Sequence, residues 1–171
     1  FFADSLMQTG KTFLNSTISF QDSASGSYIE GIEFSGNITF TNNTSINNII
    51  IKRCKINGTF NIPGDLTNPS NNLSLLENVF INTVTISNAT NVILSNNIFQ
   101  GYLYNSQSNF IANNIFLNSS AFYNSIQGDN NTIVNNIFLN GYLISGTGNV
   151  FSHNISTVTS SSISYGSNST V

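Results

Sequence analysis

Seven acidic side chains are the groups in this sequence that could act in acid–base catalysis or bind calcium. They are Asp4, Asp22, Glu30, Glu33, Asp65, Glu77 and Asp129. A catalytic pair of carboxyl groups must converge on one bond of the substrate, from within about 5–10 Å. No two of the seven are adjacent or one residue apart, and Glu30 and Glu33 would point to opposite faces of an extended strand. The spacing therefore predicts no catalytic pair, no metal site and no bound cofactor.

Cys54 and His153 are the only residues of their types in the chain. A cysteine nucleophile needs a basic partner such as histidine, and these two lie far apart in the sequence. A lone histidine without Cys, Asp or Glu at a suitable spacing is a poor metal ligand. We therefore predict an inert buried thiol at position 54 and a polar turn residue at position 153. A single cysteine also excludes a disulfide within the chain.

The elements that position these side chains come from a repeat of about 20 residues. Its four clearest copies are NVILSNNIF (91–99), NFIANNIF (109–116), NTIVNNIF (131–138) and NVFSHNIS (149–156). In each copy an aliphatic run precedes a polar pair ending in Asn and then Ile, and Phe follows in the first three. Fixed motifs separated by loops of variable length are typical of a solenoid.

One position of the repeat is asparagine in most copies, and an aromatic residue follows two positions later. The aromatic column is Phe34, Ile56, Phe80, Phe99, Phe116 and Phe138, and the column two residues earlier is Ile32, Cys54, Asn78, Asn97, Asn114, Asn136 and Asn154. Asparagine tolerates the left-handed backbone conformation of a sharp bend. Its amide can also donate to and accept from an identical residue on a coil about 4.7–4.9 Å away. We therefore predict a buried asparagine ladder beside a stack of phenylalanine rings.

Two further strand segments complete each coil. Three residues before the asparagine column, every residue is apolar: Ile29, Ile51, Leu75, Leu94, Ile111, Ile133 and Phe151. Another segment follows the aromatic column, over residues 37–40, 59–62, 83–86, 102–105, 121–124 and 142–145. Period-two alternation points one set of its side chains inward, namely Ile38, Phe60, Val84, Leu103, Phe122 and Leu143. The sequence therefore predicts three strands per coil.

The alignment of the repeats brings opposite charges together. It places Glu30 beside Lys52, Glu33 beside Lys55, and Arg53 beside Glu77. Opposite charges on neighbouring strands stabilise a sheet, and an exposed pair contributes about 0.2–1 kcal/mol. We therefore favour structural ion pairing for this charge cluster over a binding or catalytic patch.

Four tyrosines of neighbouring third segments form the other candidate surface: Tyr102, Tyr104, Tyr123 and Tyr142. Aromatic rings exposed on a rigid face can stack on sugar rings or anchor a protein partner. The alternative is ordinary packing beneath loops. The sequence leaves both interpretations open.

Charged residues make up only 6% of the chain, against about 25% in a typical domain. Four basic residues and a formal net charge of −3 argue against binding to nucleic acid or to an anionic membrane surface. No apolar run reaches the length of about 18 residues that a membrane span requires. The low charge and the many Asn, Ser and Thr residues favour a secreted or cell-surface location.

Eleven Asn-X-Ser/Thr sequons are candidate glycosylation sites, although a chain this rich in Asn, Ser and Thr contains many by chance. They begin at Asn15, Asn37, Asn42, Asn43, Asn57, Asn72, Asn88, Asn118, Asn130, Asn154 and Asn168.

The two ends of a solenoid expose unpaired strand edges unless a cap covers them. For residues 1–10 we predict either a short helical cap or an irregular segment. For residues 157–171 we predict a final partial coil. The chain begins at Phe1, which suggests a processed product or a fragment. We therefore expect the ends to contact other copies of the chain or other domains of a longer chain.

The asparagine column and the phenylalanine column resemble the parallel β-helix proteins of the pectate-lyase-like superfamily. They are most similar to secreted bacterial proteins with parallel β-helix repeats and a recurring NNIF-type segment. The resemblance covers residues 27–156. It implies an all-β, right-handed parallel β-helix of about seven coils with three strands each, in a single domain over residues 1–171.

The resemblance does not select one function, because that superfamily includes lyases, hydrolases, adhesins, phage tailspikes and non-catalytic surface modules. Its lyases abstract a proton with a basic residue, for which Arg53 or Lys55 is the candidate here, but no calcium cage is visible nearby. We favour a non-catalytic secreted module with a structural or adhesive role. The alternatives are a carbohydrate-binding module, a divergent polysaccharide lyase or glycoside hydrolase, and, as a minor one, an ice-binding surface. The ice-binding hypothesis rests on the pairs Thr39/Thr41, Thr83/Thr85 and Thr157/Thr159.

Overall fold

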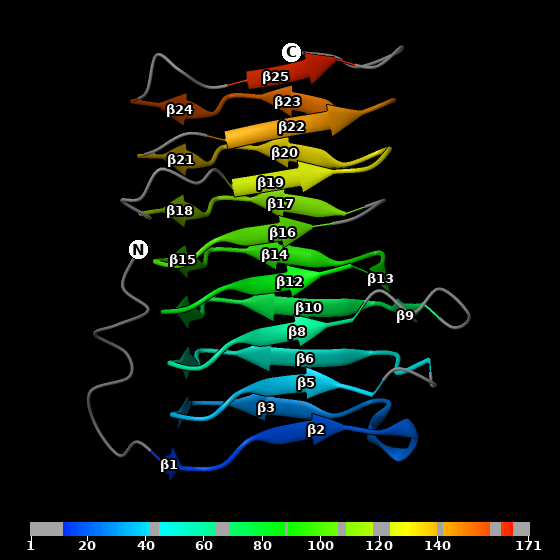
Figure 1. Ribbon diagram of the computed structural model, residues 1–171, viewed down its shortest axis with the longest axis vertical. Coiled ribbons are helices and arrows are strands. Elements are labelled where there is room, and N and C mark those ends of the chain that lie inside the picture. Colours follow the sequence, from blue (N-terminus) through cyan, green and yellow to red (C-terminus); the bar gives the residue numbers. More distant parts are fainter. Residues whose placement is uncertain are drawn as a thin grey trace.

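The computed structural model describes residues 12–41, 45–63, 69–87, 89–105, 109–117, 124–139, 142–157 and 162–165. These residues form 25 β-strands and one short 3₁₀ helix, η1 (Asp22–Ala24). The strands stack along the long axis of the molecule, with the N-terminal coils at one end and the C-terminal coils at the other (Figure 1). No helix of the described part is long and apolar enough to cross a membrane.

Three parallel sheets run along the axis, and each coil contributes one strand to each sheet. Sheet I contains β3 (Tyr28–Glu30), β6 (Ile49–Lys52), β10 (Leu73–Leu76), β14 (Ile93–Ser95), β17 (Phe110–Ala112), β20 (Thr132–Val134) and β23 (Val150–Ser152). Sheet II contains β1 (Thr12–Leu14), β4 (Ile32–Phe34), β7 (Lys55–Ile56), β11 (Val79–Phe80), β15 (Ile98–Phe99), β18 (Ile115–Phe116), β21 (Ile137–Phe138) and β24 (Ile155–Ser156). The chain is therefore a parallel β-helix of about seven coils, as predicted. Its right-handed sense stays a prediction.

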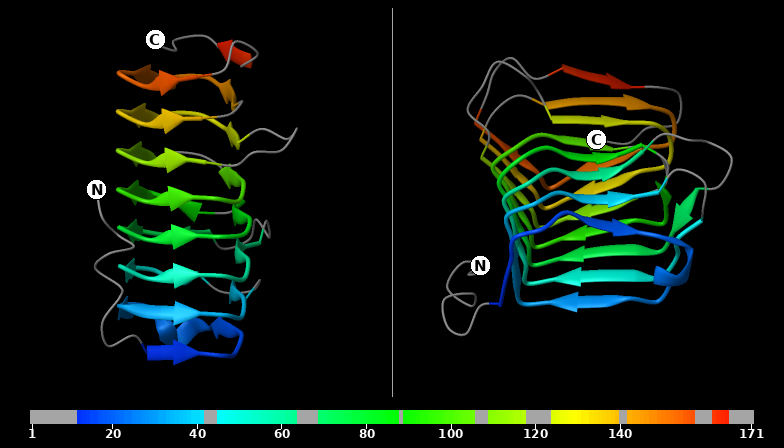
Figure 2. Two further views of the ribbon diagram at one scale, coloured as in Figure 1. Left: turned by 90° about the vertical axis from the view of Figure 1, so that its left-hand side faces the viewer. Right: turned by 60° about the horizontal axis from the view of Figure 1, so that its bottom comes forward.

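Sheet III contains β2 (Ile18–Phe20), β5 (Ile38–Phe40), β8 (Phe60–Ile62), β12 (Val84–Ile86), β16 (Leu103–Asn105), β19 (Asn124–Gln127), β22 (Tyr142–Gly146) and β25 (Ser162–Tyr165). A small additional sheet pairs β9 (Ser70–Asn71) with β13 (Ala89–Thr90). The tilted view in Figure 2 shows the three sheets around one interior. Since β25 pairs with β22, residues 162–165 form the predicted final partial coil. The predicted cap at residues 1–10 lies outside the described residues.

The interior holds the predicted stack of phenylalanine rings. Phe80, Phe99, Phe116 and Phe138 are buried, and their ring centroids are 5.0, 4.9 and 4.6 Å apart in turn, with interplanar angles of 8°, 7° and 3°. This spacing is that of neighbouring strands, so the rings repeat with the backbone. A second series of ring contacts joins Phe20 to Phe40, Phe40 to Phe60 and Phe60 to Phe80. The alignment of the repeats did not predict this second series.

The predicted asparagine ladder is formed at the corner between sheets I and II. The side-chain oxygen of Asn114 accepts hydrogen bonds from the backbone N–H and the side-chain amide of Asn97, at 2.9 and 3.0 Å. Asn114 in turn donates to the oxygen of Asn136 and to the backbone carbonyl of Leu94. The same arrangement links Asn78 to Asn97 and Asn136 to Asn154. Each buried amide therefore finds partners on the coil before and the coil after it.

The left-handed residue of this corner is the one before the ladder asparagine, which corrects the role predicted for the asparagine itself. The residues with φ between 53° and 58° at this corner are Arg53, Glu77, Asn96, Asn113, Asn135 and His153. Their side chains lie at the surface, whereas the following residue points inward. The bend and the ladder are therefore two separate positions, and the sequence pattern NN supplies one asparagine to each.

A second, shorter ladder lies at the corner where the chain enters sheet I. Our sequence analysis did not predict this ladder. The side-chain oxygen of Asn109 accepts from the backbone N–H of Val92, and that of Asn131 accepts from the backbone N–H of Asn109. Asn149 serves Asn131 in the same way, at 2.8 Å. These asparagines begin three of the four repeat segments, so the signal was present in the sequence.

The turn from sheet II to sheet III has the same length in most coils: the next inward side chain lies four positions after the residue of the aromatic column, with three residues between them. A side-chain carbon at Gly58 would overlap the carbonyl oxygen of Gly36 on the preceding coil, so this turn requires glycine. The same four-residue step from Phe138 leads to Tyr142, which is only 6% exposed and lies in the core. Leu143 instead pairs with Ser125, whose other neighbour is Tyr104. Tyr142 therefore occupies the inward position in this coil. The side chain of Leu143 and the whole of Phe122 lie outside what the structure describes.

Replacement of Asn114 by Ala tests how much the ladder contributes to stability. The variant leaves the backbone N–H of Asn97 and the carbonyl of Leu94 without their buried partner, so we expect a loss of about 3 kcal/mol or more in the free energy of unfolding. The measurement is urea denaturation followed by far-ultraviolet circular dichroism. Asn113→Gly is the matched control, because glycine adopts the left-handed conformation freely, and it should change stability by less than about 1 kcal/mol. Equal effects of the two changes would contradict this role of the ladder.

Candidate functional site

The charge cluster lies along the corner between sheets I and II in the first three coils. The guanidinium group of Arg53 bridges two coils, with Nη1 2.9 Å from Glu30 Oε1 and Nε 2.8 Å from Glu77 Oε2. Lys52 Nζ lies 3.7 Å from Glu77 Oε1. The predicted pairing of Arg53 with Glu77 is confirmed. Glu30 lies beside Lys52 in the register, but Arg53 supplies its closest ion pair.

Glu33 is the most buried carboxylate of the cluster, with an exposed fraction of 7%. Its Oε1 lies 3.2 Å from Lys55 Nζ and accepts a hydrogen bond of 3.0 Å from the side-chain amide of Asn57. The predicted pairing of Glu33 with Lys55 is therefore confirmed. Because a buried carboxylate is stable only when it is paired, these contacts explain how Glu33 is accommodated.

The electrostatic environment keeps Glu30 ionised. A hydrogen bond of 2.5 Å from the hydroxyl of Tyr28 lowers the pKa of Glu30, and the nearby charges of Arg53 and Lys52 lower it further. The same hydrogen bond raises the pKa of Tyr28. A general acid needs the opposite shift, towards a raised pKa. Glu30 is therefore suited to an ion pair and unsuited to donating a proton at neutral pH.

Arg53 and Glu77 also occupy the left-handed corner position that later coils fill with asparagine. This conformation costs a residue other than glycine or asparagine about 1–2 kcal/mol. The ion pair between the two residues offsets part of that cost. The cluster thus has a structural explanation in both its contacts and its backbone.

Cys54 replaces asparagine in the ladder column and copies part of its hydrogen bonding. Its backbone N–H donates to Asn78 Oδ1 at 2.9 Å, and its thiol donates to the carbonyl of Lys52 at 3.2 Å. The side-chain oxygen that an asparagine would place here is replaced by a sulfur atom, which is a weak acceptor. Burial raises the pKa of the Cys54 thiol. The side chain is buried, as predicted, and the neutral thiol that burial favours is a poor nucleophile.

His153 lies at the left-handed corner position and is exposed, as expected for a polar turn residue. Across the described ranges, no three His, Cys, Asp or Glu side chains come close enough together to hold a metal ion.

The four tyrosines do not form one exposed surface. Tyr104 is 40% exposed, and its ring centroid lies 6.3 Å from that of Tyr102. Tyr142 is buried against Phe138 and Phe151, at 4.8 and 5.4 Å between ring centroids. Tyr123 lies outside the described residues. Of the two interpretations left open by the sequence, the structure favours packing for Tyr142, which belongs to the core.

The threonine pairs of the ice-binding hypothesis do not form an unbroken column on sheet III. The register pairs Thr39 with Asn61, Asn61 with Thr85, and Thr85 with Tyr104. Thr157 is exposed at the far end of the solenoid, and Thr159 lies outside the described residues.

The sequons differ in how their asparagines are used. Asn42, Asn43, Asn88, Asn118 and Asn168 lie outside the described residues, whereas Asn15, Asn37, Asn72 and Asn130 are exposed. The amide of Asn57 donates to Glu33. Asn154 accepts from Asn136 and donates to the carbonyls of Ile133 and Ser152, so a glycan there would disrupt the ladder. Glycosylation at the exposed positions stays a prediction.

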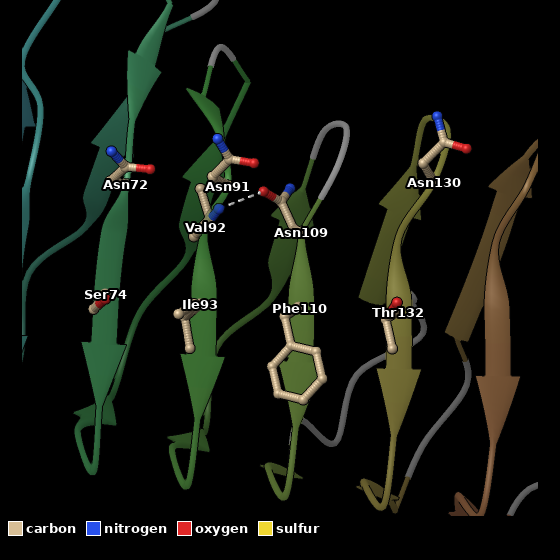
Figure 3. Close-up of a pocket in the computed structure, with 9 residues that line it drawn as sticks. All are labelled: Asn72, Ser74, Asn91, Val92, Ile93, Asn109, Phe110, Asn130 and Thr132. Carbon is tan, nitrogen blue, oxygen red and sulfur yellow. Dashed lines mark hydrogen bonds between the residues drawn. The ribbon is translucent and has the colours of Figure 1, made fainter.

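An open groove of about 500 Å³ lies on the outer face of sheet I (Figure 3), and no residue of the charge cluster lines it. It is lined by Asn72, Ser74, Asn91, Val92, Ile93, Asn109, Phe110, Asn130 and Thr132. These residues belong to β10, β14, β17 and β20 and to the corners that precede them. None of the lining side chains is charged. Sequence reasoning missed this groove, although the inward positions of Leu75, Leu94, Ile111 and Ile133 already imply outward-facing neighbours.

Comparisons with known proteins identify no relative: no family model, no curated protein and no solved structure matches the chain. The parallel β-helix and its surfaces are therefore the basis for any functional inference.

Two replacements of Cys54 test whether the thiol acts as a member of the ladder. Valine is similar in size but removes the hydrogen bond from the thiol to the carbonyl of Lys52, so we expect Cys54→Val to lose about 0.5–1.5 kcal/mol in the free energy of unfolding. Cys54→Asn restores an amide at this position and should be at least as stable as the natural protein. Urea denaturation provides the comparison. A valine variant as stable as the natural protein would show that the thiol contributes packing volume alone and that its hydrogen bond does not stabilise the fold.

Proposed function

We propose that the protein is a non-catalytic module, secreted or at the cell surface, that acts as a rigid structural or adhesive element. The observation that carries this proposal is the separation of charge from the groove. Glu30, Glu33 and Glu77 are engaged in ion pairs with Arg53, Lys52 and Lys55. The groove offers an uncharged, partly apolar surface instead.

Rigidity supports this role. The asparagine ladder and the stacked rings fix the distance between coils, so the outward-facing side chains are held in straight rows. A surface whose side chains are already ordered loses little conformational entropy when it binds a partner.

The alternative of a polysaccharide lyase or hydrolase is less well supported by the contacts. Arg53 and Lys55 are the candidate bases, but each is held in an ion pair with a carboxylate. The interaction with Glu77 and then the charge of Glu30 raise the pKa of Arg53, so the guanidinium group is still less able to accept a proton.

We expect the purified protein to release neither unsaturated nor reducing sugars from pectate or alginate. Ultraviolet absorbance detects a lyase and a reducing-sugar assay detects a hydrolase. The labelled protein should nevertheless be retained on a film of extracellular matrix that contains both protein and polysaccharide, beyond the retention of serum albumin. Product formation that disappears in Arg53→Ala would overturn the non-catalytic proposal, and a protein that does not adhere would remove the adhesive role.

The strand edges support a second part of the proposal, namely contact with other copies or with further domains of a longer chain. Among the described residues, β3 and β23 each have a neighbouring strand in sheet I on one side only. Such edges recruit other strands unless they are covered.

Sedimentation velocity at several protein concentrations tests this assembly. We expect larger species as the concentration rises, because end-to-end pairing of coils satisfies the backbone groups of the edge strands. Tyr28→Pro, on edge strand β3, removes a backbone donor that faces away from the neighbouring strand β6 and should weaken the association. A monomer of unchanged size at all concentrations would show that the described edges are not used.

A further inference from the structure

We propose that the groove on sheet I binds an uncharged oligosaccharide or polysaccharide, with a sugar ring stacked on Phe110 and sugar hydroxyls bonded to Asn91 and Asn130. This inference rests on the adhesive role proposed above and supplies the class of its ligand. The site differs from the tyrosine surface that the sequence suggested, which lies on sheet III.

Phe110 provides the stacking surface. Its side chain is 44% exposed at the start of β17, between Ile93 on β14 and Thr132 on β20. Figure 3 shows its ring lying over the strand with one face turned outward. An aromatic ring presented by its face packs well against the C–H groups of a sugar ring. Its neighbour Ile93 is also exposed, at 41%, so the two side chains form a small apolar patch within the groove.

The backbone that carries Phe110 is held in place by hydrogen bonds to the neighbouring coils. It directly follows Asn109, a buried member of the second ladder. Asn109 accepts from the backbone N–H of Val92 at 3.0 Å and donates from its own backbone to Asn131 at 3.1 Å. The ring is therefore carried by a backbone that is hydrogen-bonded to the coils on both sides, which is the kind of preorganisation that favours binding.

Asn91 and Asn130 provide polar groups at the rim of the groove. Both have the left-handed conformation, with φ of 54° and 58°, and both side chains are exposed at the corner before the strand. Their amides form no hydrogen bond with any of the described residues. An amide both donates and accepts, as does a sugar hydroxyl, so the two groups match. A few polar groups around an exposed ring are the usual composition of a specific ligand site.

The charge distribution selects a neutral ligand. The groove has no charged lining residue, and Asp129 and His153 are the only ionisable charges after residue 77. The carboxylate of Asp129 accepts a hydrogen bond from the backbone of Thr147. In the part of the chain that the structure describes, no basic residue lines the groove to attract uronic acids or sulfated sugars.

The shape of the groove favours a chain of sugars. Its lining comes from four successive strands, which span roughly 14 Å along the solenoid axis at the usual strand spacing. A ligand that crosses these strands contacts Asn91 and Asn130, which lie two coils apart, and the ring of Phe110 between them. We therefore infer that the ligand lies along the axis of the solenoid.

Affinity electrophoresis in gels containing a soluble neutral polysaccharide tests the proposal. The panel is xylan, glucomannan and mixed-linkage β-glucan, with polygalacturonate as the acidic comparison. We expect at least one neutral polysaccharide to retard the protein, and polygalacturonate not to do so. Phe110→Ala should weaken the binding about tenfold or more, because the stacking surface is removed. Asn91→Gly keeps the left-handed turn, removes the amide and should weaken binding less strongly.

Tyr104→Ala is the matched control, since it removes an exposed aromatic ring from sheet III and should leave the retardation unchanged. Circular dichroism must show the same fold for all variants. Retardation that survives Phe110→Ala, or is lost only in Tyr104→Ala, would overturn the proposal. So would a concentration-dependent dimer that Phe110→Ala abolishes, because the groove would then bind a second copy of the chain.

The two proposals fail in different ways. A protein that adheres to the matrix film but is retarded by no neutral polysaccharide keeps its adhesive role and loses the proposed ligand. A protein that does neither loses both.

Discussion

The stacking of buried asparagine amides is the interaction on which the rest of this structure depends. At the corner between sheets I and II the chain changes direction, and the backbone groups of this bend are buried. Without the asparagine side chains these backbone groups would lack hydrogen-bond partners. From Asn97 onward, each asparagine in the ladder accepts from the backbone and the side chain of the asparagine one coil before it, and donates to a carbonyl of that preceding coil, as Asn114 does to Leu94. Because every amide depends on the next one, the coils must stay in one register, and a shift by a single residue would leave several buried groups unpaired.

This register determines the remaining columns. Once Asn97 and Asn114 are stacked, Phe99 and Phe116 follow two residues later at nearly parallel orientation. In the coil of Phe99, the inward residue of sheet III, Leu103, follows four residues after the ring. The outer faces are fixed by the same constraint, since alternation turns the neighbours of Leu94 and Ile111 outward. The row that contains Ile93 and Phe110 is therefore a consequence of the core, although its concave shape depends on which side chains occupy it.

Much of the fold could be predicted because its columns repeat. The asparagine and phenylalanine columns, the three strands per coil and two of the three ion pairs followed from aligning the copies. The remaining details depend on three-dimensional geometry that one sequence does not reveal. Arg53 contacts Glu30 as well as Glu77 because its guanidinium group can bridge two coils. Tyr142 lies in the core because it follows Phe138 by the same four positions as in most other coils. The apolar alternation of residues 142–145 alone did not distinguish Tyr142 from Leu143 as the inward residue. The groove was missed because no charged or catalytic residue marks it.

The ladder column also explains why the two halves of the solenoid have different surfaces. In the early coils the column holds Ile32 and Cys54, so amide stacking begins only at Asn78. The same early coils carry Arg53 and Glu77 at the left-handed corner, and ion pairs between coils supply there some of the lateral bonding that amides supply later. From Asn78 onward the amides maintain the register without charged residues. The later coils are therefore free to present an uncharged outer face, and the groove lies largely on these coils.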